Sequence, residues 1–558
     1  MNRTLYAAAS ALAIVLTVLA KTSSAADQPA PSTPDLSAMV RTPPAPASPR
    51  INGARVYGER AGKPFFFHVP VTGDRPMTIT AEGLPAGIAI DAASGNITGL
   101  CGEAGTHRVK LTAANARGTA TSELDIVIGD TICLTPPMGW NSWNHFARRV
   151  SDPIIRDTAD VMVNTGLIDH GWTYVNIDDC WEGERDAQGR IAGNEKFPDL
   201  KGLADFVHSK GLKFGIYSSP GPKTCAGFVA TYQHEDQDAQ TYADWGVDYV
   251  KYDWCSYGGI ANQLKFDKYS ALLGGDDSAA IKPLWDQRAT LEKNRKRSAE
   301  ENAKLKEVRG KIDAIISKID PAKRAAIDLE LYKLPYAAFG QSLAKANRDI
   351  VYSFCQYGMG DSWEWAGDLG GNCWRTTGDI KATWKSMSTI GFGQNGHEKY
   401  GRLGHWNDPD MLEIGNKGLS PDECYTHMTL WCMLSAPLLI GCDMTRMDPV
   451  TAGIFASDEV IAVNQDALGK QGYRLSQDGD TEVWIKPLAD GTLAVALFNR
   501  GETAAKVKCS LPDLKLDGPQ PVRDLWRQKD LTPATEAVSA DVAPHSAELY
   551  KVGAPKPQ

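Results

Sequence analysis

The sequence predicts an α/β protein in which a (β/α)8 TIM barrel lies between two β-sandwiches, the first immunoglobulin-like (Ig-like) and the second antiparallel. Two observations support this prediction. Between residues 134 and 467, eight short strand candidates alternate with helical stretches, which is the pattern of a parallel barrel. Residues 50–130 and 470–555 instead contain short strands of alternating hydrophobicity, separated by turns and without helical patterns.

The N-terminus has the pattern of a signal peptide. Arg3 supplies a positive charge, an apolar run extends from Leu5 to Leu19, and small residues follow. The run is short for a membrane span, so a signal peptide over residues 1–26 is favoured over a membrane anchor, and no later stretch predicts an integral span. We therefore expect export to the periplasm or the extracellular space. Residues 27–49 are rich in Pro and Ala, which predicts an extended, poorly packed linker.

The first sandwich is predicted over residues 50–130. Strand-like runs such as FFFHVPV and ELDIVIG are separated by Gly, Pro and Asp turns. Residues 84–115 resemble the immunoglobulin-like modules that are often attached to secreted bacterial enzymes, which implies a small β-sandwich. We expect a spacer rather than a glycan-binding module, because the run lacks an obvious exposed aromatic platform.

Eight strand candidates define the barrel, and each runs into polar residues at its C-terminal end. They span residues 138–143, 174–179, 213–218, 249–253, 350–355, 373–379, 405–411 and 437–443. In one of the helical stretches between them, Ser151 is the predicted N-cap, and Ile155, Ala159 and Met162 share one face. We expect the active site at the C-terminal ends of the strands, where the loops that follow the strands of such a barrel come together.

A long insertion, about residues 259–349, separates the fourth and fifth strands. Apolar residues recur in it at three- and four-residue spacing beside a charged face, which predicts an amphipathic helix. These apolar residues are Leu305, Val308, Ile312, Ile315 and Ile319. The pattern favours a solvated arm packed on the barrel; a lid or an oligomer contact is the alternative, because the arm follows the fourth strand.

Composition narrows the class of ligand. The net charge of −9 and the pI near 5.7 argue against nucleic acid, which selects clustered basic surface. The 15 tryptophans and the Asp, Lys, Arg and Tyr residues at strand ends suit a neutral sugar. No Gly-rich phosphate loop, Ser-His-Asp arrangement, CxxC pair or HExxH motif is evident, so we expect neither a cofactor nor a metal. The 11 cysteines are an odd number, so at least one has no partner within the chain.

Seven ordered motifs give the sequence a family resemblance. They are TPPMGWNSWNHF, YVNIDDCW, GLKFGIYSSPGPKTC, WGVDYVKYDWC, CWRTTGDI, GHWNDPDML and APLLIGCDM. Together they resemble glycoside hydrolase family twenty-seven, from about Thr135 to Gln465, and more loosely in the C-terminal sandwich. The resemblance implies a retaining exo-glycosidase that hydrolyses terminal α-D-galactosyl residues of oligosaccharides or polysaccharides by double displacement, without a cofactor.

The same resemblance implies roles for individual residues. Asp253 matches the nucleophile and Asp379 the acid/base. The positions that match substrate-binding residues are Trp143, Asp178, Asp179, Tyr217, Cys225, Lys251, Cys355, Tyr357, Arg375, Asp410 and Met411. Cys355 and Tyr357 are expected to face the C2 side of the sugar, and the guanidinium of Arg375 is expected to point mainly at the sugar.

Export and the resemblance together imply a disulfide between Cys225 and Cys255, which end neighbouring strands. The family commonly pairs a cysteine in the position of Cys180 with one shortly after the first strand. This chain has no cysteine there, so Cys180 is expected to be free or to find another partner.

Alternative functions remain open at this point. Within the family they are α-N-acetylgalactosaminidase, β-L-arabinopyranosidase and dextran-acting enzymes. A glycan-binding protein built on an inactive barrel is a further alternative, against which the two intact catalytic aspartates argue. The sequence does not determine the oligomeric state or the natural aglycone.

Overall fold

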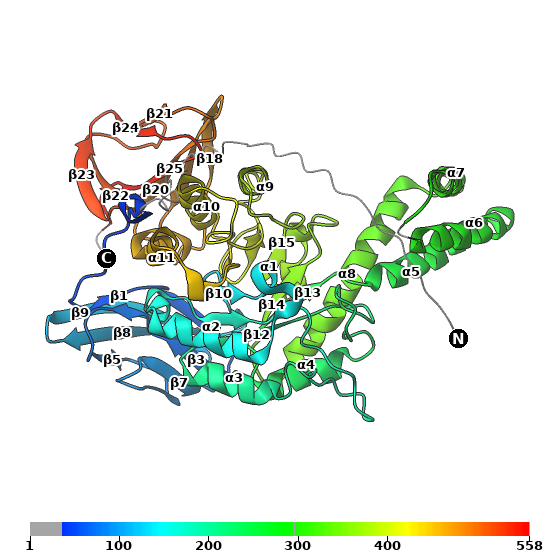
Figure 1. The fold of residues 1–558 in the computed structure, drawn as a ribbon, viewed down its shortest axis with the longest axis horizontal. Coiled ribbons are helices and arrows are strands. Elements are labelled where there is room, and N and C mark those ends of the chain that lie inside the picture. Colours follow the sequence, from blue (N-terminus) through cyan, green and yellow to red (C-terminus); the bar gives the residue numbers. More distant parts are fainter. Residues whose placement is uncertain (1–35, 295, 557–558) are drawn as a thin grey trace, which may run out of the picture.

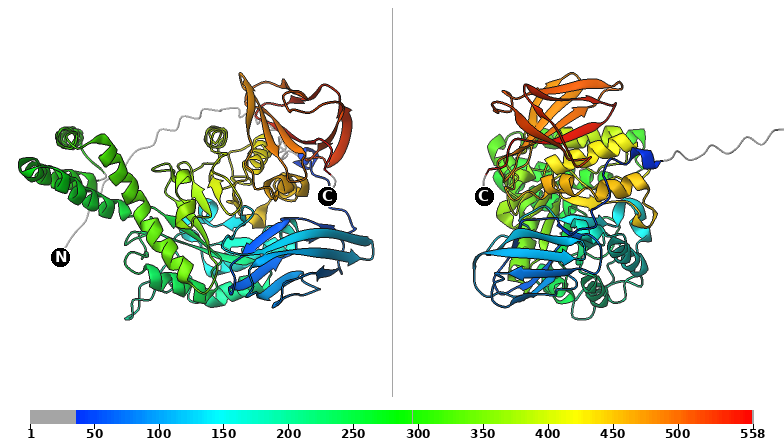
Figure 2. Two further views of the ribbon diagram at one scale, coloured as in Figure 1. Left: turned by 180° about the vertical axis from the view of Figure 1, so that it is seen from behind. Right: turned by 90° about the vertical axis from the view of Figure 1, so that its left-hand side faces the viewer.

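The computed structural model describes residues 36–294 and 296–556, which form three domains and a helical arm (Figure 1). The predicted signal peptide and the first part of the predicted linker lie outside the described residues. The N-terminal module and the C-terminal sandwich pack beside the barrel at one end of the molecule, and the arm extends from the other end (Figures 1 and 2). No helix within the described residues has the length and apolar character that crossing a membrane requires.

The N-terminal module is a two-sheet β-sandwich, as predicted. One sheet has the strand order β2-β9-β8-β5 and the other β3-β7-β6, while β1 pairs with β4. The strands are β1 (Arg50–Ile51), β2 (Val56–Glu59), β3 (Pro64–His68), β4 (Val71–Thr72), β5 (Thr78–Glu82), β6 (Ile88–Ile90), β7 (Asn96–Leu100), β8 (Gly105–Asn115) and β9 (Gly118–Ile128). Phe65, Ile97, Val109 and Leu124 fill the core between the two sheets.

Eight parallel strands form the barrel in the order β16-β15-β14-β13-β12-β11-β10-β17. They are β10 (Met138–Asn141), β11 (Tyr174–Asn176), β12 (Lys213–Ser218), β13 (Tyr249–Asp253), β14 (Val351–Cys355), β15 (Cys373–Arg375), β16 (Trp406–Asp408) and β17 (Leu438–Ile440). Leu412, just after β16, forms a parallel bridge with Ile440 of β17, which closes the ring. Each strand lies within a predicted range, so the barrel prediction is confirmed.

Helices surround this barrel. The α-helices outside the arm are α1 (Trp143–Phe146), α2 (Asp152–Asn164), α3 (Leu200–Ser209), α4 (Glu235–Trp245), α9 (Trp384–Phe392), α10 (Pro421–Met433), α11 (Pro449–Phe455) and α12 (Asp458–Asn464). The 3-10 helices are η1 (Leu36–Met39), η2 (Ala147–Arg149), η3 (Leu167–His170), η4 (Ser362–Glu364), η5 (Gly367–Leu369) and η6 (Met444–Arg446). Helix α2 begins after Ser151 and buries the predicted face, but the Ser151 side chain makes no capping hydrogen bond.

The insertion after β13 forms four helices. They are α5 (Tyr257–Leu272), α6 (Gly275–Lys293), α7 (Ala299–Ile316) and α8 (Pro321–Lys345). Helices α6 and α7 lie at the far end of the arm (Figure 1), where Trp285, Val308 and Ile312 form a small core of their own. Helix α8 returns to the barrel, and its Phe339 ring stacks on Tyr252 of β13 with 4.3 Å between centroids. The outer half of the insertion is therefore an arm, whereas α8 is part of the barrel wall.

The C-terminal domain is the predicted antiparallel β-sandwich. A six-stranded sheet has the order β18-β19-β20-β25-β22-β23, and β21 pairs with β24 across the core. The strands are β18 (Tyr473–Asp478), β19 (Thr481–Pro487), β20 (Leu493–Asn499), β21 (Ala505–Ser510), β22 (Gln520–Asp524), β23 (Lys529–Ala534), β24 (Ala537–Val542) and β25 (Ala547–Val552).

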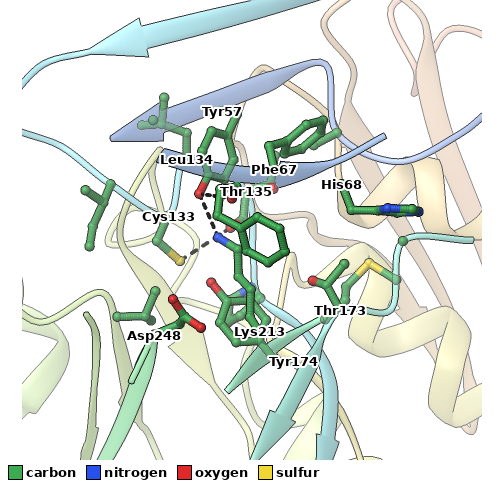
Figure 3. Close-up of a pocket in the computed structure, with 18 of the residues that line it drawn as sticks. Tyr57, Phe67, His68, Cys133, Leu134, Thr135, Thr173, Tyr174, Lys213 and Asp248 are labelled. Atoms are coloured by element: carbon green, nitrogen blue, oxygen red, sulfur yellow. Dashed lines mark hydrogen bonds between the residues drawn. The ribbon is translucent and has the colours of Figure 1, made fainter. Parts of the chain in front are cut away.

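The N-terminal module docks on the floor of the barrel, where the barrel strands begin. The backbone N–H of Arg60 donates to Asp349 at 2.7 Å, and its guanidinium pairs with the same carboxylate. Lys213, at the start of β12, donates to the Tyr57 hydroxyl at 2.6 Å and lies between the rings of Tyr57 and Tyr174 (Figure 3). Polar contacts therefore hold the module at the end of the barrel opposite to the C-terminal strand ends.

Residues 36–49 are mostly exposed but are anchored at Arg41. The Arg41 guanidinium lies 4.2 Å from the ring centroid of Tyr425, pairs with Asp422 at 2.6 Å and donates to the Ala547 carbonyl at 2.9 Å. One arginine thus joins this part of the predicted linker to both the barrel and the C-terminal sandwich.

Candidate active site

An open pocket of about 850 Å³ lies at the C-terminal ends of the barrel strands. The predicted site residues that line it are Trp143, Asp178, Asp179, Tyr217, Cys225, Lys251, Asp253, Tyr357, Arg375, Asp379, Asp410 and Met411. They come from the ends of different strands, which is the usual construction of an active site on this fold. None of the lining residues comes from the helical arm, so in this structure the arm does not cover the pocket.

Asp253 lies at the end of β13 with its carboxylate enclosed by donors. One oxygen accepts hydrogen bonds from the Tyr357 hydroxyl and the Trp254 backbone N–H, both at 2.7 Å, and the other accepts from the Tyr217 hydroxyl at 3.0 Å. Burial raises the pKa of Asp253, while Lys251 and these hydrogen bonds oppose the rise. The donors fix the orientation of the carboxylate and stabilise its charged form, which is the form that can attack a carbon atom.

Lys251 lies near this carboxylate and binds a second one, that of Asp178. It lies two residues before Asp253, on the same face of β13, because successive side chains in a strand alternate. Its Nζ donates to Asp178 at 2.8 Å, and Asn141 donates to the same oxygen at 3.0 Å. Burial on its own lowers the pKa of Lys251, but the nearby charges of Asp178 and Asp253, with the hydrogen bond to Asp178, together outweigh burial and raise it above its ordinary value. The ammonium is therefore charged and held in place.

A disulfide-linked loop completes this side of the pocket. Cys225 and Cys255 are bonded with their Cα atoms 4.9 Å apart, in agreement with the predicted pairing. The backbone N–H of Ala226, next to Cys225, donates to Asp179 at 2.7 Å. The loop therefore orients Asp179. Cys180, which follows Asp179 in the sequence, is a free, buried thiol.

The disulfide also affects whether these two cysteines could bind a metal ion. Among the described residues, one group of His, Cys, Asp or Glu side chains is compact enough to hold an ion, and it consists of Cys225, Asp253 and Cys255. Its two sulfur atoms are bonded to each other, and metal coordination would require free thiolates. The geometry here favours the disulfide over a metal site.

Arg375 connects two carboxylates on the other side of the pocket. Its Nη2 lies 2.9 Å from Asp410 and 3.1 Å from Asp379. Asp410 also accepts from the backbone N–H of Ile380 at 2.8 Å, which draws the loop after β15 toward it. The expectation that the guanidinium points mainly at the sugar is wrong, because these carboxylates occupy one edge of it. The side chain of Asp379 is 71% exposed, so it lies at the mouth of the pocket.

Of the predicted catalytic and substrate-binding residues, Cys355 alone does not line the pocket. It is buried at the end of β14, with its Sγ 3.6 Å from Nη1 of Arg375. The Tyr357 ring centroid lies 5.7 Å from the guanidinium carbon of Arg375. Arg375 and Tyr357 therefore cover Cys355, and the expectation that its thiol faces the sugar is wrong.

The pocket also contains polar residues that sequence reasoning did not select. Glu413 accepts hydrogen bonds from Asn144 and, at 2.6 Å, from Asn416. His145 Nε2 lies 4.0 Å from Asp443. Asn144 and His145 directly follow the GWNSW motif and Asp443 ends the eighth strand candidate, so their places in the motifs were an available signal. The other lining residues are Ala147, Ile380, Lys381, Ala382, Gly415, Lys417 and Arg446.

Comparison with known families identifies each domain. The alpha galactosidase A family matches residues 135–274 and 316–466, more than half of the chain. This chain belongs to the melibiase family. The alpha galactosidase C-terminal β-sandwich domain matches residues 478–552, and an Ig-domain family matches residues 48–129. The melibiase match leaves out residues 275–315, so α6 and nearly all of α7 are additions to the family domain.

Individual relatives agree with the family match. Alpha-galactosidase 2 of Arabidopsis thaliana is 38% identical over 431 residues, which are 76% of this melibiase and 91% of that protein. Alpha-galactosidase A of Cellvibrio japonicus is 38% identical over 388 residues, which are 67% of this chain and 78% of that protein. The crystal structure of alpha-galactosidase I from Mortierella vinacea superposes with a TM-score of 0.61 at 30% identity and covers 76% of this chain and 99% of its own. A Bacteroides fragilis structure, provisionally described as an alpha-galactosidase/melibiase, covers 92% of this chain and 99% of its own, with a TM-score of 0.75 and 33% identity.

Proposed function

We propose that this melibiase hydrolyses terminal α-D-galactosyl groups of oligosaccharides or polysaccharides with retention of configuration, using Asp253 as the nucleophile and Asp379 as the acid/base. The observation that supports these roles best is the contrast between the two carboxylates. Asp253 is enclosed by hydrogen-bond donors at a strand end, whereas Asp379 is exposed at the mouth, where a leaving group would depart. The related proteins are named α-galactosidases, which supports galactose as the sugar that is released.

The two steps follow from this arrangement. An Asp253 oxygen attacks C1 of galactose, the bond from C1 to the leaving oxygen breaks, and Asp379 gives its proton to that oxygen. The resulting carboxylate of Asp379 lies 3.1 Å from Arg375, whose guanidinium can donate a hydrogen bond to it. It then takes a proton from water, whose oxygen attacks C1 and releases Asp253.

The polar groups of the pocket suit galactose. Asp178 and Asp179 are expected to accept hydrogen bonds from the axial O4 and from O6, and Lys251 to donate to sugar hydroxyls. Tyr357 lies beside Asp253 and is expected to occupy the space that an acetamide at C2 would need. Losing the hydroxymethyl group or forcing in an acetamide should each cost on the order of 1–3 kcal/mol at the transition state.

We therefore expect kcat/KM for nitrophenyl α-galactoside to exceed the values for β-L-arabinopyranoside and α-N-acetylgalactosaminide by at least about tenfold. If either competitor is cleaved faster, that alternative within the family replaces galactose. Proton NMR of the products tests the stereochemistry: α-galactose should form first, and β-galactose would mean inversion.

The nucleophile is tested by Asp253→Asn. The amide cannot form the glycosyl-enzyme, so kcat should fall by several orders of magnitude while circular dichroism remains that of the wild type. Asp244→Asn, at an exposed position of α4, is a matched control and should keep full activity. A folded Asp253→Asn enzyme with a tenth of wild-type activity would exclude Asp253 as the nucleophile.

Export by a signal peptide over residues 1–26 is also proposed, from the apolar run and the small residues that follow it. Expression of the full chain with N-terminal sequencing of the periplasmic and medium fractions tests this proposal. A mature protein that begins near residue 27 is expected; full-length protein confined to the cytosol or the membrane would refute it.

A further inference from the structure

Three neighbouring loops, which follow β15, β16 and β17, form one side of the mouth of the pocket. A Cβ atom at Gly418 would lie 2.0 Å from the Ala382 carbonyl oxygen, so the loop after β16 lies directly against the loop after β15. A Cβ atom at Gly415 would lie 2.8 Å from Sγ of Cys442, so the same loop also lies against the one after β17. A leaving group on this side of the galactose subsite would lie against these loops.

Each of these loops places one cationic residue in the lining of the pocket: Lys381, Lys417 and Arg446. All three side chains are exposed. Within residues 36–294 and 296–556, neither lysine forms an ion pair, and Arg446 reaches Asp443 only at 3.6 Å. We call Lys381, Lys417 and Arg446 the cationic rim.

The carboxylates nearby make few direct contacts with the cationic rim. Glu413 is occupied by Asn144 and Asn416, and Asp443 accepts hydrogen bonds from the backbone N–H and hydroxyl of Thr445. Asp379 is already paired with Arg375. Among the described residues, the mouth therefore has two ammonium groups without an ion-pair partner and a guanidinium with one long contact to a carboxylate.

We propose that the cationic rim binds an anionic leaving group, namely a sugar that bears a carboxylate or sulfate group and is linked to the terminal galactosyl residue. This inference rests on the proposed function, which places galactose at the bottom of the pocket and the aglycone at its mouth. Guanidinium and ammonium groups are the side chains that recognise carboxylate and sulfate oxygens. Because the rim is exposed, each contact contributes modestly and is screened by salt.

The test compares three galactosides: one with a neutral sugar as leaving group, one with a uronate and one with a sulfated sugar. The wild type should cleave at least one of the anionic substrates with a kcat/KM about tenfold above the neutral one at low salt, and 0.5 M NaCl should reduce that ratio. The double variant Lys381→Gln/Lys417→Gln should bring the ratio close to one. A preference for the uronate or for the sulfated sugar identifies which anion the rim selects.

The matched control is Lys506→Gln/Lys508→Gln, which removes the same charge from exposed positions of β21 in the C-terminal sandwich and should leave the ratio unchanged. An anionic-to-neutral ratio near one in the wild type, or equal losses on all three substrates in the rim variant, would overturn the inference. Failure of the wild type on every α-galactoside would instead overturn the proposed function, so the two failures are distinguishable.

Discussion

Lys486 is a charged residue that should destabilise the protein at neutral pH. Its side chain is fully buried on β19, donates to the Ser435 hydroxyl and has no ion-pair partner among the described residues. Burial lowers its pKa from 10.5 to about 8. Below pH 8 the folded chain has to bury the ammonium ion, whereas between pH 8 and 10.5 the unfolded chain binds a proton that the folded chain does not. Stability attributable to this group therefore rises with pH across that window.

The size of the effect follows from the same shift. The difference between 10.5 and about 8 corresponds to a cost of about 3 kcal/mol below pH 8. Lys486→Met keeps the length of the side chain and removes the charge, but it loses the hydrogen bond to Ser435, worth about 1 kcal/mol. Ser435 keeps its own hydrogen bond to the Lys470 carbonyl, at 3.2 Å. We expect Lys486→Met to raise the free energy of unfolding by about 2 kcal/mol at pH 7.

The assay is thermal or urea unfolding of the wild type and Lys486→Met, compared at each pH from 7 to 10. The gain should shrink as the pH rises above 8, since the folded wild type then loses the buried charge. Lys508→Met, at an exposed position of β21, is the control and should show no pH-dependent gain. A gain that is the same at pH 7 and pH 10, or a variant less stable than the wild type at pH 7, would refute the reasoning.

Three further predictions concern the pocket. Tyr357→Phe removes a hydrogen bond to the charged Asp253 and should lower kcat/KM on nitrophenyl α-galactoside by about 10- to 100-fold; a loss below twofold would contradict a positioning role. Asp379→Ala should impair glycosylation by melibiose or raffinose more than by an activated aryl galactoside, because nitrophenolate leaves without a proton; equal losses would argue against the acid role. Peptide mapping of the exported protein without reduction should recover Cys225 and Cys255 as one linked pair, and two alkylated thiols would contradict the disulfide.

The architecture was predictable because strand length, the polarity of the strand ends and the spacing of apolar residues all indicate the same fold. The strands of the barrel are short, apolar and followed by polar residues, and the two sandwiches show two-residue alternation without helical spacing. The helical insertion shows where such reasoning stops. Its amphipathic pattern predicts α7, but nothing in its spacing distinguishes the arm from α8, whose Phe339 packs on Tyr252 of the barrel. Distinguishing them requires knowing which apolar face meets the barrel, and that depends on tertiary packing.

In the site, the sequence could place residues at strand ends but not the contacts between strands. Cys355 and Tyr357 are two residues apart, so alternation alone puts both side chains on one face. The backbone at Tyr357 has a φ of 61°, which turns the chain there, and Arg375 from the next strand covers the thiol. The orientation of Arg375 likewise depends on Asp410, which is 35 positions later in the sequence and becomes its partner only in the folded barrel.

The contact between the N-terminal module and the barrel floor limits how this enzyme can be shortened. A fragment that begins at residue 134 would keep every residue of the pocket, yet it would leave Asp349 without Arg60 and Lys213 without Tyr57. The polar groups on the newly exposed floor would lose the partners that the N-terminal module supplies. Such a fragment should lose thermal tolerance before it loses substrate recognition, and a smaller enzyme would need new residues on the floor as well as a new N-terminus.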